Sequence, residues 1–220
     1  MVTLEAIDFA YPGGGFRLRV PSLEVAAGEK VAIVGPSGTG KTTLLNMVAG
    51  LLRPDSGAVR VGETEVTALS DARRRSFRAR EIGFIFQDFA LLEYLTAREN
   101  ILYPYRISRG LTLTREVRAR AEALAAACGL ADKLARRPTQ LSQGEQQRVA
   151  ICRALITEPK LILSDEATGN LDPENKGLIL DLLFERVEAV GAGLLAVTHD
   201  HDLLPRFDRV IDFATFREAA

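Results

Sequence analysis

The sequence predicts an α/β fold with an antiparallel β portion at its N-terminus and an inserted α-helical subdomain. Short, apolar, β-branched segments dominate residues 1–87 and return after residue 157, a pattern typical of strands. Residues 88–156 lose this pattern and carry helical periodicity instead. A chain of 220 residues is long enough for one large domain. We therefore expect a single domain over 1–220, with an α/β core in 1–87 and 157–220 and a helical subdomain in 88–156.

The first expected strands lie on either side of a glycine-rich turn. Residues 2–9 are rich in β-formers, and after the turn at 12–15 the segment 16–20 alternates apolar and charged side chains, as in a half-buried strand. Residues 30–34 are short, apolar and β-branched, as in a buried strand. The other strands expected in the core are residues 58–61, 82–86, 161–164 and 194–198.

The expected helices follow from apolar periodicity and from start and stop signals. One opens after the loop that follows residue 34 and stops near Gly50, and a second covers residues 115–128 and ends at Gly129. A third covers residues 142–157. Asp172 and Pro173 open the last helix as its N-cap and first helical residue.

Composition excludes several classes of function. The formal net charge is −1, so no global field draws the protein to nucleic acid or to an anionic membrane surface. Cys128 and Cys152 lack metal-ligand spacing and are expected to be small buried thiols in a reducing compartment. Glu5 and Asp8 interrupt the first apolar stretch, so we expect no signal peptide, and no segment approaches the roughly 18 apolar residues of a spanning helix. We expect a cytosolic protein that reaches a membrane only through a partner.

The loop at residues 35–42 fits the phosphate-binding pattern G-x-x-x-x-G-K-[ST], between an expected strand and an expected helix. Glycines let successive backbone N–H groups point at phosphate oxygens, and the helix N-terminus adds partial positive charge. Lys41 would reach the β- and γ-phosphates, and the Thr42 hydroxyl would ligate Mg²⁺. The alternative is a glycine-rich turn with a solvated lysine. The candidate nucleotide-binding residues of this loop are Gly35, Ser37, Gly38, Thr39, Gly40, Lys41, Thr42 and Thr43.

Two carboxylates, Asp165 and Glu166, end the apolar strand expected at residues 161–164. In open α/β sheets, ligands bind at the carboxyl ends of strands. Asp165 there would help to hold Mg²⁺, and Glu166, pointing another way, would face an attacking water as general base. The alternative is a pair of solvated acids in a turn.

One motif names a family. The run Leu141-Ser142-Gln143-Gly144-Glu145, followed by Gln146-Gln147-Arg148, resembles the signature motif of the ABC ATPases. The resemblance covers nearly the whole chain. It implies catalytic roles for Lys41, Glu166, His199 and Gln87, and a metal-binding role for Gln87 as well. It also implies nucleotide contacts from Ser142, Gly144 and Asp172, which lies in the segment 169–172, and stacking of Tyr11 on adenine. Tyr11 and His199 alone would be an ordinary turn aromatic and an ordinary hydrogen-bonded histidine.

The motif departs from the family pattern at two positions, and a third departure follows the acidic pair. Gln143 replaces a glycine and Glu145 replaces a glutamine, while Ala167 replaces a proline. Ser142 and Glu145 also match a capping box, which favours a well-formed helix start. Glu145 would bring negative charge near the γ-phosphate bound by a partner copy, and we expect it to lower turnover or ATP affinity, while the retained Ser142 and Gly144 preserve the motif.

The segments 86–92, 95–100 and 168–172 resemble the ABC group that drives lipoprotein release and macrolide export. In the family this region faces the membrane subunit. We expect Leu91, Leu92 and Tyr94 to be exposed for that contact. The alternative is ordinary packing inside the helical subdomain.

The resemblance implies an ATP-hydrolysing transporter subunit that uses ATP and Mg²⁺. Two copies would form a head-to-tail dimer on the cytoplasmic face of the inner (plasma) membrane, and ATP-driven closure would act on an integral membrane permease. One alternative is a non-transport ABC switch on a membrane scaffold such as a cell-division complex. A DNA-repair or chromosome ATPase would need a long coiled coil, and a P-loop kinase would need an acceptor site; neither is found. No nucleic acid and no direct membrane insertion are expected.

Overall fold

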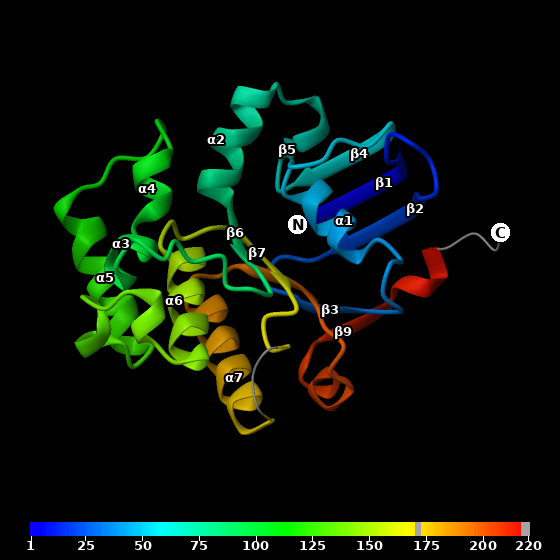
Figure 1. Ribbon diagram of the computed structural model, residues 1–220. Coiled ribbons are helices and arrows are strands. Elements are labelled where there is room, and N and C mark those ends of the chain that lie inside the picture. Colours follow the sequence, from blue (N-terminus) through cyan, green and yellow to red (C-terminus); the bar gives the residue numbers. More distant parts are fainter. Residues whose placement is uncertain (170–172, 217–220) are drawn as a thin grey trace.

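The computed structural model describes residues 1–169 and 173–216, and the side chains of residues 173–175 are left aside. Two sheets make up the core, with a helical part to one side (Figure 1). The first is antiparallel, in the order β2-β1-β4-β5. Its strands are β1 (Val2–Ala10), β2 (Arg17–Val25), β4 (Ser56–Val61) and β5 (Thr64–Glu65).

The second sheet is parallel, in the order β6-β7-β8-β3-β9. Strands β3, β6, β7 and β8 are buried on both faces, which explains their apolar sequences. The carboxyl ends of β3, β6, β7 and β8 meet at one edge, where ligands bind in open α/β sheets. The strands are β3 (Lys30–Val34), β6 (Ile82–Ile85), β7 (Leu161–Asp165), β8 (Gly193–Val197) and β9 (Arg209–Asp212).

Helices surround and separate the sheets. Helix α1 shares one apolar cluster with strands of both sheets, and α6 and α7 contribute to a second cluster on the parallel sheet. The helices are α1 (Lys41–Val48), α2 (Asp71–Glu81), α3 (Ala97–Ile101), α4 (Tyr103–Ile107), α5 (Arg115–Ala127), α6 (Gln143–Leu155) and α7 (Pro173–Ala189). Short 3₁₀ turns cover Val66–Ala68, Ala131–Lys133, Pro138–Gln140, His201–Arg206 and Phe213–Phe216.

A third apolar cluster joins α3, α5 and α6, with Cys128 and Cys152 buried in it as free thiols, as expected from the sequence. Helix α6 also packs against the parallel sheet through Ile151 and Leu155. The helical part therefore shares α6 with the core, and the domain division at residues 88 and 156 stays a prediction. Across 1–169 and 173–216, the helices are too short or too polar for any of them to traverse a bilayer.

The expected strands and helices lie within one to five residues of their predicted ends wherever the structure describes them. Helices α2, α3 and α4 and strands β5 and β9 were missed. Helix α2 buries Phe77 alone and is otherwise rich in arginine, so it shows no apolar stripe. Strand β9 is mostly exposed at the edge of its sheet, where the apolar signal is weak.

Candidate functional site

The loop at residues 35–40 runs from β3 into α1 with its glycines in the left-handed region, including Gly40 at φ 103°. A Cβ added at Gly40 would lie 2.7 Å from Cζ of Phe16, so a larger residue here would strain the backbone and displace the Phe16 ring. Thr39 is buried and its hydroxyl donates to the Pro36 carbonyl at 2.9 Å. Thr39 thus stabilises the loop itself.

Lys41 folds back over this loop. Its Nζ donates to the carbonyls of Gly35 and Pro36 at 2.6 and 2.8 Å, and only 6% of the residue is exposed. Burial lowers the pKa of the ammonium, while the nearby Glu166 and Asp165 carboxylates act to raise it. The ammonium therefore lies where an anion in the loop would meet it.

Asp165 ends β7 and is hydrogen-bonded to the Thr42 side chain at the start of α1. Burial raises the pKa of Asp165, and the Thr42 hydrogen bond acts to lower it. A hydroxyl and a carboxylate in contact are hard oxygen donors of the kind that Mg²⁺ prefers. The donor chemistry fits a magnesium site.

Glu166 and His199 meet beside the loop. His199 Nε2 lies 2.7 Å from Glu166 Oε1, and both side chains line two adjoining cavities. Glu166 has φ 52°, uncommon for a non-glycine residue and a mark of functional sites. Its N–H donates to the Val197 carbonyl at 3.0 Å, which holds this turn against β8.

The first cavity, of about 510 Å³, brings Gln87 to the same place as Glu166 and His199. Gln87 follows β6, Glu166 follows β7 and His199 follows β8. Three residues far apart in sequence therefore converge because their strands end at one edge of the sheet.

The second cavity, of about 440 Å³, lies over the glycine-rich loop and is lined by Ser37, Gly38, Gly40, Lys41, Thr42 and Thr43. Tyr11 and Phe16 form its aromatic wall, with ring centroids 5.6 Å apart. The Tyr11 hydroxyl lies 3.1 Å from Thr43 Oγ1. Sequence reasoning missed Phe16. The only available signal was its position across the three-glycine turn from Tyr11.

Ser142 and Gly144 line neither cavity. Ser142 is the exposed N-cap of α6, and the expected capping box is present: Ser142 N–H donates to Glu145 Oε2 at 2.8 Å and Glu145 N–H donates to Ser142 Oγ at 3.2 Å. Among the residues that the structure describes, none has an atom within 4 Å of a Cβ added at Gly144. Within one chain, these residues are not brought to the loop at residues 35–42.

Arg153 connects α6 to the loop after Gln87. Its guanidinium donates to the carbonyls of Ala90 and Phe89 at 2.5 and 2.7 Å. Both of these residues have positive φ values, 46° and 61°. Burial lowers the pKa of Arg153 to about 10, although the Asp88 carboxylate acts to raise it. Sequence reasoning missed this arginine.

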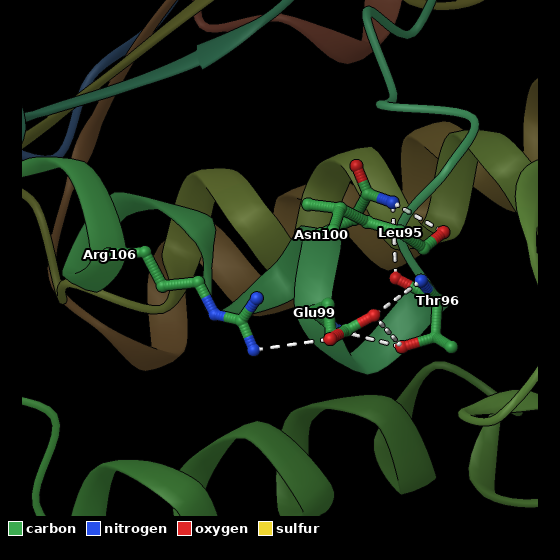
Figure 2. Close-up of polar contacts among 5 residues, drawn as sticks. All are labelled: Leu95, Thr96, Glu99, Asn100 and Arg106. Atoms are coloured by element: carbon green, nitrogen blue, oxygen red, sulfur yellow. Dashed lines mark hydrogen bonds and ion pairs between the residues drawn. The ribbon is translucent and has the colours of Figure 1, made fainter.

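The expected exposure of Leu91 and Leu92 is wrong. Leu91 packs against the helical cluster and both residues are half-buried, because buried Asn100 ties down the loop. Asn100 accepts from Leu92 N–H at 2.8 Å. It also donates to the Leu95 and Thr96 carbonyls, and Glu99 links Thr96 to Arg106 (Figure 2). Tyr94 is 70% exposed, as expected.

The expected nucleotide contact of Asp172 lies outside the described residues. Gly169, at the start of the same segment, lines the first cavity, and its N–H donates to the Glu166 carbonyl at 2.9 Å.

Comparison with known proteins finds a matching family model, similar relatives and a similar solved structure. The family model described as ABC transporter matches residues 18–169. The lipoprotein-releasing system ATP-binding protein LolD of Maricaulis maris is 47% identical over 90% of this chain and 85% of its own length, and LolD of Cereibacter sphaeroides is 44% identical over 96% and 95%. The solved dimeric ATP-binding cassette MJ0796 in a post-hydrolysis state with ADP and Pi superposes with a TM-score of 0.84 at 36% identity, over 96% of this chain and 94% of that one.

Proposed function

The chain belongs to the ABC transporter family as its ATP-binding, ATP-hydrolysing subunit, and we propose that it powers extraction of lipoproteins by a separate membrane subunit. The observation that carries the hydrolytic assignment is the convergence of Lys41, the Thr42–Asp165 pair and the Glu166–His199 pair around one loop. The lipoprotein assignment rests on the relatives named above.

The loop N–H groups and Lys41 would hold the phosphates of ATP. To do so, Lys41 would exchange its two carbonyl acceptors for phosphate oxygens of higher charge, which strengthens the hydrogen bonds. Thr42 and Asp165 would hold Mg²⁺, with Gln87 as a further oxygen donor. The bound ion would neutralise charge on the β- and γ-phosphate oxygens.

Glu166 would take the proton of the water that attacks the γ-phosphate. In the structure its carboxylate is in contact with His199, so it is oriented before substrate arrives. His199 would hold the Glu166 carboxylate and the γ-phosphate in position relative to one another. Tyr11 and Phe16 would bind the base, since both rings line the cavity beside the loop.

Ser142, Gly144 and Asp172 would act in the site of a second copy. Ser142 and Gly144 are exposed or half-exposed at the start of α6, away from both cavities of their own chain. A helix N-terminus attracts anions, and the free space at Gly144 leaves room for a phosphate group. A head-to-tail dimer would place each ATP between one loop and the partner's α6.

The membrane subunit would contact a groove of about 770 Å³ between α2 and α4. Four arginines line it, together with Phe84, Phe86 and Tyr103. Arg153 is one of the four and also holds the loop after Gln87, so a partner in the groove would be coupled to the site. This contact would keep the subunit on the cytoplasmic face of the membrane.

The test uses Glu166→Gln and Lys41→Ala. Glu166→Gln should bind MgATP, stop turnover and accumulate as a dimer in gel filtration, because the amide keeps the shape and removes the base. Lys41→Ala should lose hydrolysis through loss of phosphate binding. Wild-type turnover in either variant would refute the site. Co-purification with its membrane subunit, and ATP-dependent release of a lipoprotein from reconstituted vesicles, would test the lipoprotein assignment.

A further inference from the structure

The signature motif of this chain carries a carboxylate, Glu145, and the structure shows which groups contact it. Glu145 lies in the first turn of α6, three residues after Ser142. One oxygen, Oε2, accepts from Ser142 N–H at 2.8 Å, and the other, Oε1, lies 3.7 Å from Lys133 Nζ. The two carboxylate oxygens therefore have different tasks, capping and ion pairing.

The ion pair is partly buried. The Glu145 and Lys133 side chains are only 18% and 21% exposed. The pKa of Glu145 is lowered first by the Ser142 backbone hydrogen bond and then by the charges of Lys133 and Arg136, so the group is ionised at neutral pH. Lys133 also lies 3.1 Å from Asp132, but that carboxylate is 73% exposed and its charge is screened by water.

We propose that Lys133 is a positioning residue of the composite ATP site, which neutralises Glu145 so that the N-terminus of α6 can accept the partner copy's γ-phosphate. This rests on the proposed role of Ser142. A carboxylate at this point would otherwise oppose the partial positive charge of the helix start. Lys133 belongs to the 3₁₀ turn at Ala131–Lys133, so the charge that compensates Glu145 comes from outside the signature motif.

The experiment measures ATP-driven dimerisation in the Glu166→Gln background, by analytical ultracentrifugation at low salt. Adding Lys133→Met should weaken dimerisation roughly tenfold, as expected for an unbalanced charge within about 10 Å of a phosphate. Glu145→Gln keeps the capping box, because glutamine also fits that motif. The triple variant Lys133→Met/Glu145→Gln/Glu166→Gln should dimerise within about twofold of Glu145→Gln/Glu166→Gln.

Salt and a matched lysine separate charge compensation from packing. The Lys133→Met defect should shrink at high salt, because the repulsion is screened. Lys160→Met is the matched control. Lys160 pairs with Glu81 at 3.1 Å and directly precedes β7, so it lies at the edge of the parallel sheet opposite to the candidate site, and its replacement should leave dimerisation unchanged. An equal defect in the presence and absence of Glu145, or no defect at all, overturns the inference. Failure of the Glu166→Gln parent to dimerise would instead refute the proposed composite site, and the inference with it.

Discussion

Replacing Gly144 by alanine should separate the stability of this protein from its activity. Gly144 is in the first turn of α6, and a Cβ at this position would meet no atom of residues 1–169 or 173–216 within 4 Å. Its φ is not in the left-handed region, so alanine fits the backbone. Within one chain the substitution should raise the free energy of unfolding by up to about 1 kcal/mol, because alanine loses less backbone entropy than glycine.

The same methyl group should damage the composite site. It would occupy the space between the start of α6 and the phosphate of the partner's ATP. Displacing a reacting group by about 1 Å costs on the order of a hundredfold in rate. We expect ATP hydrolysis to fall by about that factor while ATP binding to the monomer is unchanged.

The assay pairs urea unfolding with ATP turnover and with gel filtration in the Glu166→Gln background. Gly177→Ala is the matched control: it is a half-buried glycine of α7 whose added Cβ would first meet Arg206 Nη1 at 4.0 Å. It should stabilise to a similar degree and leave turnover unchanged. Normal dimerisation and turnover in Gly144→Ala would refute the reasoning about the partner's phosphate, and a loss of stability would refute the reasoning about free space.

Three further outcomes are expected. Phe16→Ala should raise the KM for ATP several-fold with little change in kcat, since the ring lines the cavity beside Tyr11 and supplies no reacting group; steady-state kinetics check this, and a kcat loss at unchanged KM would contradict it. Arg153→Met should lower the free energy of unfolding by about 2 kcal/mol, because two carbonyls lose a charged donor, and urea unfolding measures it; an unchanged value would show that water replaces the guanidinium. Asp165→Asn should abolish turnover yet raise Tm at neutral pH, because burial raises the pKa of this carboxyl in the folded state and its ionised form therefore destabilises the fold. The Tm difference should vanish as pH falls below the unfolded value of 3.8, where the carboxyl is protonated in both states, and a pH-independent difference would contradict the assignment.

The sequence by itself determined the parts of this protein that are written in consecutive residues. The loop at residues 35–42 between a strand and a helix, and the carboxylates at the end of β7, were predicted because each is one local signal with one physical purpose. The capping box at Ser142 was predicted for the same reason. The buried strands were predicted because a strand covered on both faces must be apolar along its whole length.

Only the tertiary structure decided the contacts between residues far apart in the chain. Phe16 over Gly40, Lys133 beside Glu145 and Arg153 on the loop at residues 89–90 join segments separated by at least a dozen residues. No periodicity or spacing encodes such pairs. They depend on how sheets and helices pack, and that packing is set by the burial of apolar side chains across the whole domain. The same packing half-buries Leu91 and Leu92, where the local pattern alone suggested exposure.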